Sequence, residues 1–179
     1  MNTNIIQILI ISLIIALLII IGIKCFKCSP QLSDEEINDY IIDLWVNFED
    51  HTIERYTKQQ LVVISIIAYD SEINNGGLNQ FFSNSSRIFA AYISNSLEQI
   101  NAKNHQKQFD KFVAENKIDV NKLDLFVSND INEFIKQYDN YSFSAFDKKY
   151  YKLEKEENLS NLIIEYAKNN YDEIFTDIK

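Results

Sequence analysis

The spacing of apolar positions predicts a helical chain. From Ser33 onward, apolar residues recur three and four positions apart, the period of an amphipathic helix. The first helix is expected to begin at Ser33, because Ser33 and Glu36 form a capping-box pattern. Its predicted inner face consists of Ile37, Tyr40, Ile41, Leu44, Trp45 and Phe48.

A second capping-box pattern, Thr57 with Gln60, precedes residues 61–69, which are apolar on nearly every side. This segment is expected to be a helix at the centre of a bundle, although its β-branched residues leave a strand as the alternative. Further helical patterns cover 87–102, 105–116, 131–138 and 159–175, and the last has an inner face of Leu162, Ile163, Tyr166 and Tyr171. The pattern predicts an all-α fold, a compact bundle of about six to eight helices.

The amino-terminal part of the chain differs from the rest. Residues 5–23 are apolar except for Gln7 and Ser12, and a helix of that length spans roughly 28 Å, close to the thickness of a bilayer core. We therefore expect a short tail (1–4), a transmembrane helix (5–23), a linker (24–32) and a helical domain (33–179). A cleaved secretory leader is the alternative.

The charge next to the apolar segment sets the expected orientation. Lys24 and Lys27 follow the segment and no basic side chain precedes it, so the domain is expected in the cytoplasm, as part of a single-pass membrane protein. Cys25 and Cys28 have the C-x-x-C spacing, but no further cysteines complete a zinc site. We expect two thiols without assigned chemistry, with lipidation or a redox role as alternatives.

Composition narrows the class further. Hydrophobic residues make up 46% and aromatic residues 13% of the 179 residues, enough to fill a core. One proline and three glycines argue against an all-β fold with many turns. The 26 acidic residues, which all follow Ser33, outnumber the 17 basic ones and give a net charge of -9. A direct nucleic-acid binder is therefore not expected.

The acidic residues are densest in the first predicted helix and just after it. The candidate partner-binding residues are Asp34, Glu35, Glu36, Asp39, Asp43, Glu49 and Asp50. Residues four apart on a helix are separated by about 6 Å along its axis, close to the roughly 6 to 7 Å between neighbouring DNA phosphates, and Asp39 and Asp43 have this spacing. Such a surface could attract a basic partner, while ordinary solvation and the helix dipole explain the same acids.

Gly76 and Gly77 are the only glycines after Ser33. They predict a corner where one helix closes in a left-handed conformation and the chain reverses, so that Leu78, Phe81 and Phe82 return to the core. The spacing does not match a calcium loop or a phosphate-binding loop.

Residues that could carry chemistry are sparse, and we expect no cofactor, no metal and no catalytic residue. His51 and His105 lie in polar surroundings at predicted helix ends and are expected on the surface. Asp70, Glu72 and Asn74 could line a small-molecule pocket, although turn hydrogen bonds explain them equally. A late aromatic group is expected in the core and at its rim: Tyr138, Tyr141, Phe143, Phe146, Tyr150 and Tyr151.

Two segments resemble a known family. The first contains Asn74, Asn75, Gly76, Gly77, Gln80, Phe81, Phe82 and Asn84, and it resembles the N-G-G-F-x-Q-[YF]-[FY]-x-N signature of the bacterial DNA-mimic-protein domain family, with Leu78 in place of the usual aromatic residue. The second, Phe143–Tyr151, is similar to a later segment of that family. The resemblance implies an all-α fold over 33–175, and the namesake of the family presents carboxylates in place of DNA phosphates to a DNA-binding regulator.

These observations lead to one expected function and two alternatives. We expect a membrane-anchored, non-enzymatic, acidic helical domain that binds a protein partner, including a basic DNA-binding protein by imitation of DNA. The first alternative is an immunity-type protein that neutralises a toxin at the membrane. The second is an enzyme or small-molecule binder that uses Asp70 to Gln80.

Overall fold

A computed structural model describes residues 32–127 and 130–176. The described residues from Asp34 onward form one compact unit. All the regular structure in the described residues is helical, which confirms the all-α prediction for this part of the chain. The α-helices are α2 (Asp34–Val46), α3 (Lys58–Ser83), α4 (Ala90–Gln99), α5 (Lys103–Glu115), α6 (Ile131–Asn140), α7 (Phe143–Leu153), α8 (Leu159–Asn169) and α9 (Tyr171–Ile174). Short 3-10 helices are η1 (Asp50–Arg55), η2 (Ser85–Phe89) and η3 (Asp124–Phe126).

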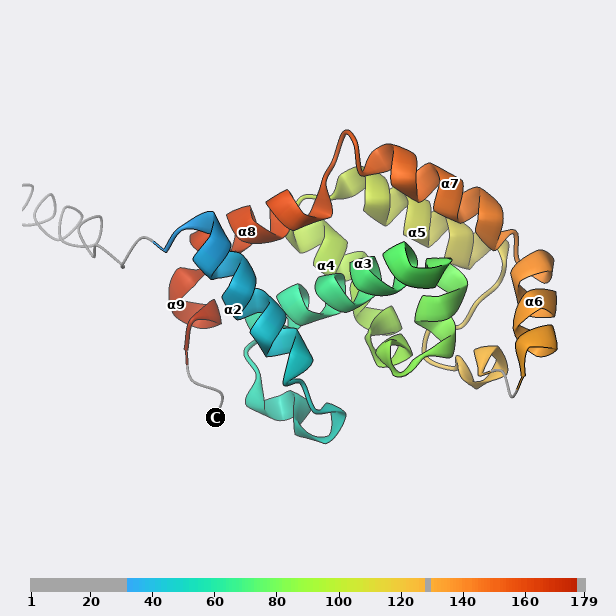
Figure 1. Cartoon of the computed structure of the whole chain (residues 1–179), viewed down its shortest axis with the longest axis horizontal. Helices are drawn as coiled ribbons and strands as arrows, with labels where there is room; N and C mark the ends of the chain where they lie inside the picture. The colour runs from blue at the N-terminus through green and yellow to red at the C-terminus, as the bar shows by residue number, and fades with distance from the viewer. Residues whose placement is uncertain (1–31, 128–129, 177–179) are drawn as a thin grey trace, which may run out of the picture. The chain divides into compact units, whose positions relative to one another are not determined.

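Helix α3 is the central element, and α2, α4, α7 and α8 all pack against it (Figure 1). The apolar segment at 61–69 lies in its first half, and all but two of its residues are buried. The predicted capping box is present, because Thr57 Oγ1 accepts from the Gln60 amide at 3.0 Å and Gln60 Oε1 accepts from the Thr57 amide at 2.9 Å. Gln60 Nε2 also donates to the Ile174 carbonyl at 2.9 Å, which fixes α9 against the start of α3.

The inner face of α2 agrees with the predicted pattern. Ile37, Ile41 and Leu44 are buried, and the other predicted members of the face are half-buried. The helix ends at Val46, so Phe48 lies beyond it in the connection to η1.

The glycine pair marks a corner as predicted, because α3 consists of two helical segments that meet at a kink there, although neither glycine has the left-handed helical conformation. Gly76 has φ -156° and Gly77 has φ +83°, after which helical geometry resumes as far as Ser83. The chain changes direction near this end of α3 (Figure 1). Leu78, Phe81 and Phe82 are fully buried, as expected for residues directed back into the core.

Other boundaries differ from the predicted ones. The pattern at 87–102 divides into η2 and α4, and the pattern at 159–175 breaks at Asn170, whose φ of -123° and ψ of 39° are not helical. Helix α7 is absent from the predicted helices, although Phe143, Phe146 and Tyr150 have helical spacing. They are buried, whereas Tyr151 is 43% exposed, so the prediction of core and rim aromatics is confirmed.

The expected membrane localisation is contradicted. In residues 32–127 and 130–176, no helix is both long enough and apolar enough to cross a bilayer. The predicted transmembrane helix at 5–23, together with Cys25 and Cys28, lies outside the described residues. Hydropathy alone does not distinguish a membrane-spanning helix from a helix that is buried within a protein. The longest described helix, α3, is of the second kind, because its apolar side chains pack against other helices. The prediction of a single-pass membrane protein with a cytoplasmic domain is therefore withdrawn.

Candidate partner-binding site

Glu72 connects the glycine motif to η2. Its Oε2 accepts from Gln80 Nε2 at 2.6 Å and from Asn84 Nδ2 at 2.8 Å, and its Oε1 accepts from Ser86 Oγ at 2.9 Å. Gln80 and Asn84 belong to the motif, and Ser86 belongs to η2. Hydrogen bonds to a charged group are stronger than neutral ones, so the Glu72 carboxylate holds the end of α3 through Gln80 and Asn84, and η2 through Ser86.

Asp147 joins the two motif segments. Its Oδ1 accepts from the Leu78 amide at 3.0 Å and its Oδ2 accepts from the Tyr138 hydroxyl at 3.2 Å. Burial raises the pKa of the Asp147 carboxyl, while these two hydrogen bonds act in the opposite direction. A side chain at position 77 would collide with this carboxylate, because a Cβ on Gly77 would lie 2.9 Å from Asp147 Cγ. The glycine is therefore needed for space as well as for its positive φ.

Asp70 and Tyr150 form a second, partly buried contact between α3 and α7. The Tyr150 hydroxyl donates to Asp70 Oδ1, and Asn74 Nδ2 donates to the same oxygen at 2.8 Å. Burial raises the pKa of Asp70, with the Tyr150 bond opposing it, and burial together with the Asp70 charge raises the pKa of Tyr150. Asp70 and Asn74 are four positions apart on α3, so the bond between them is local, and Asn74 is exposed. Burial and the contact between Asp70 and Tyr150 explain the pKa shifts of these two side chains.

His105 is buried, so its expected surface position is wrong. Its ring is 0% exposed and lies 5.0 Å from the Tyr150 ring, with Nε2 at 3.1 Å from the Glu157 carbonyl oxygen and 3.2 Å from Glu154 Oε1. His105 shares the buried face of α5 with Phe109 and Phe112, and this helical spacing was the available signal. His51, in contrast, is exposed.

The predicted acidic residues of α2 are all exposed, but they are not equivalent. Glu35, Asp39 and Asp43 follow one another at four-residue intervals and form a line, which we call the acidic face. Asp34 pairs with Lys168 of α8 at 2.5 Å, so part of its charge is compensated. Glu36 is exposed in the first turn.

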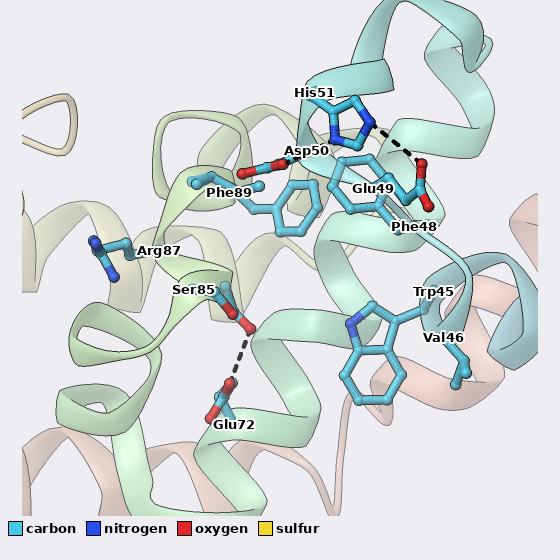
Figure 2. A pocket seen from close by; sticks show the side chains of 12 residues that line it. Trp45, Val46, Phe48, Glu49, Asp50, His51, Glu72, Ser85, Arg87 and Phe89 are labelled. Atoms are coloured by element: carbon cyan, nitrogen blue, oxygen red, sulfur yellow. Dashed lines mark hydrogen bonds and ion pairs between the residues drawn. The ribbon is translucent and has the colours of Figure 1, made fainter.

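A groove begins where α2 ends (Figure 2). Its volume is about 740 Å³, and it lies between the end of α2, η2 and Glu72. Its apolar lining includes Trp45, Val46, Phe48, Ile88 and Phe89. Phe48 and Phe89 are in contact, with ring centroids 4.9 Å apart, and form one wall. Val46 is 67% exposed and Ile88 is 41% exposed, so apolar surface faces the opening.

The charged groups around the groove are mainly negative. Glu49 and Asp50 lie at the rim on either side of His51, with His51 Nε2 at 3.5 Å from Glu49 Oε2 and Nδ1 at 3.6 Å from Asp50 Oδ1 (Figure 2). Arg87 donates to the carbonyls of Ser83 and Asn84, at 3.4 and 2.9 Å, and its guanidinium points away from Trp45. The two predicted acids that follow α2 thus border a cavity, whereas those on α2 form a convex face.

A second, more open depression adjoins the glycine kink. It has a volume of about 410 Å³ and is lined by Asn75, Gln80, Ser83, Asn84, Asp130, Ile131 and Phe134. Asn84 and Gln80 are already bonded to Glu72, and Asp130 Oδ1 accepts from the Asn132 amide at 2.7 Å. The remaining motif residues are placed differently: Gly77, Phe81 and Phe82 are buried, while Gly76 is exposed.

Sequence reasoning identified the acids but not the groove. The sequence pattern places Trp45 on the inner face of the first helix, and nothing nearby in the sequence connects it with Ile88. An apolar Val46 beside the only tryptophan, at a helix end rich in acids, was the one local signal.

The fold and these contacts define a helical protein whose paired motifs serve mainly to lock its helices together. Comparison with protein families matches residues 54–170 to the family described as DMP19-like protein. The match covers more than half of the chain, so the chain belongs to the DMP19-like, or DNA mimic protein, family. No curated protein and no solved structure matches it.

Proposed function

We propose that this DMP19-like protein is a non-enzymatic, acidic helical domain that binds a protein partner through the basic surface with which that partner binds DNA. The acidic face carries the proposal. Glu35, Asp39 and Asp43 are exposed on one rigid helix, at intervals of about 6 Å along its axis, comparable with the phosphate spacing of DNA. Family membership supports the same function.

Charge distribution also supports a basic protein as the partner. The chain has a net charge of -9, and the first turn of α2 carries Asp34 and Glu36 beside Glu35 of the acidic face. A surface of one sign accelerates the approach of an oppositely charged partner and acts less strongly as salt increases. The proposal therefore predicts a salt-sensitive complex.

The non-enzymatic part of the proposal is supported by the contacts of the two carboxyl groups whose pKa is raised by burial, Asp70 and Asp147. Asp70 is bonded to Tyr150, and Asp147 is bonded to the Leu78 amide and to Tyr138, so their pKa shifts arise in contacts between helices. The depression beside Gly76 is lined largely by amide and hydroxyl side chains, of which Gln80 and Asn84 are bonded to Glu72.

The test compares charge on the acidic face with equal charge elsewhere. Full-length wild-type protein is immobilised, and the DNA-binding protein that it retains is identified. DNA binding by this partner is then measured in the presence of the wild type and of the variant Glu35→Gln/Asp39→Asn/Asp43→Asn. The control, Asp110→Asn/Glu115→Gln/Asp124→Asn, removes the same charge from exposed positions on α5 and η3.

We expect the acidic-face variant to inhibit at least about tenfold less well, the control to stay within about threefold of wild type, and higher salt to weaken wild-type inhibition. Equal inhibition by both variants, or no effect of wild type on DNA binding, would refute the proposal.

A further inference from the structure

The groove at the end of α2 continues from the acidic face. Val46 is the next exposed residue along this side of α2 after Asp43 and Ile42, and it lines the groove. A partner that lies along the acidic face therefore reaches the groove without leaving the surface of the domain. A role for the groove in binding this same partner rests on the proposed function.

The lining combines an aromatic ring with carboxylates. Trp45 is half-buried, so part of its indole remains accessible, and the Phe48–Phe89 pair lies beside it (Figure 2). The side chains of Glu49 and Asp50 are 63% and 72% exposed at the rim. A cation placed over an indole face and next to a carboxylate gains from both contacts.

The negative charge in the groove is only partly used within the domain. Glu72 accepts three hydrogen bonds and serves to hold η2, whereas the distances from Glu49 and Asp50 to His51 are 3.5 and 3.6 Å, longer than ordinary charged hydrogen bonds. Arg87 is bonded to backbone carbonyls on the far side of the lining. The rim can therefore accept a cationic group from outside.

We propose that the groove binds an arginine side chain from a basic segment of the partner, with the guanidinium stacked on Trp45 and paired with Glu49 or Asp50. Arginine fits better than lysine because its planar, weakly hydrated guanidinium stacks on aromatic rings and binds carboxylates through two donors. The exposed Val46 and Ile88 then contact apolar side chains next to that arginine. The acidic face supplies long-range attraction, and the groove supplies a specific anchor.

The experiment uses the only tryptophan of the chain as its reporter. Full-length protein is titrated with a blocked peptide that has one arginine between two leucines, and emission from Trp45 is recorded. The same peptide with citrulline removes the charge and keeps the shape, and a third peptide has lysine. Two protein variants lose the same charge: Glu49→Gln/Asp50→Asn at the groove and Asp39→Asn/Asp43→Asn on the acidic face, with far-UV circular dichroism as the check on folding.

We expect saturable binding of the arginine peptide, at least about tenfold weaker binding of the citrulline peptide and about threefold weaker binding of the lysine peptide. The groove variant should weaken binding at least about fivefold, and the acidic-face variant by less than about twofold. Absence of a saturable change up to about 10 mM arginine peptide, equal binding of arginine and citrulline peptides, or equal effects of the two variants would overturn the inference.

The two proposals fail in different ways. If the proposed function is wrong, the acidic-face substitutions leave inhibition of the DNA-binding protein unchanged, whatever the peptides do. If only the groove assignment is wrong, those substitutions weaken inhibition while the peptides fail to discriminate as stated.

Discussion

Substitution of Gly77 by alanine tests the contact that joins the two family segments. Gly77 has φ +83° and ψ 177°, a conformation that side chains other than glycine adopt at a cost of about 1–3 kcal/mol. The new Cβ would also displace the Asp147 carboxylate and weaken its bond to the Leu78 amide, a charged hydrogen bond of about 1.5–3 kcal/mol. Alanine restricts the unfolded chain and returns about 0.4–1 kcal/mol. We therefore expect the free energy of unfolding to fall by about 1.5–5.6 kcal/mol.

The assay is equilibrium urea unfolding followed by far-UV circular dichroism, with Gly76→Ala as the matched control. Gly76 has φ -156° and so carries no positive-φ cost, but a Cβ there would displace the Gln80 amide and weaken its charged hydrogen bond to Glu72, about 1.5–3 kcal/mol. After the gain of about 0.4–1 kcal/mol from the unfolded chain, its loss should be about 0.5–2.6 kcal/mol, smaller than the loss for Gly77→Ala. In an Asp147→Ala background the collision is absent, and Gly77→Ala should cost only the backbone part less the gain from the unfolded chain, about 0–2.6 kcal/mol. Equal losses for the two glycine variants, or the same loss for Gly77→Ala in both backgrounds, would refute the reasoning.

Three further predictions concern other contacts. Burial raises the pKa of Asp70, so the folded state binds the proton of this carboxyl more tightly than the unfolded chain does. The stability contributed by the protonated Asp70 carboxyl is therefore full below its ordinary pKa of 3.8 and is lost as pH rises through the folded-state pKa. Asp70→Asn should therefore gain stability relative to wild type as pH rises, measured by urea unfolding at several pH values, and the opposite trend would contradict this. Tyr150→Phe leaves the Asp70 carboxylate without its buried donor and should lower the unfolding free energy by about 1–3 kcal/mol. Tyr151→Phe, which removes one neutral bond to a carbonyl, should cost about 0.5–1.5 kcal/mol, and a larger loss than for Tyr150→Phe would argue against the Asp70 contact. Thr57→Ala removes the cap of α3 and should lower the thermal midpoint by an amount equivalent to about 1 kcal/mol, with half-buried Thr52→Ala, which removes a bond to the Glu49 carbonyl, as a control expected to change it less.

Patterns within a few residues predicted much of the fold. The capping box at Thr57 and Gln60 depends on groups three positions apart, so the start of α3 and the two hydrogen bonds of its cap could be predicted. The burial of 61–69 follows from an apolar surface on nearly every side of one helix. The exposed acids of α2 follow from the same periodicity, since Glu35, Asp39 and Asp43 lie opposite its buried residues.

The amino-acid sequence by itself thus determined most of the helices, though not α7, together with the central position of α3 and the acidic surface, because helix periodicity and capping act over three or four residues. Only the tertiary structure decided that Asp147 lies against Gly77, that His105 is enclosed beside Tyr150, and that Trp45 and Ile88 line one groove. Asp147 and the Leu78 amide are 69 positions apart in the chain. Contacts at such separations depend on how whole helices pack, and helix packing is decided by the combined shape of many side chains.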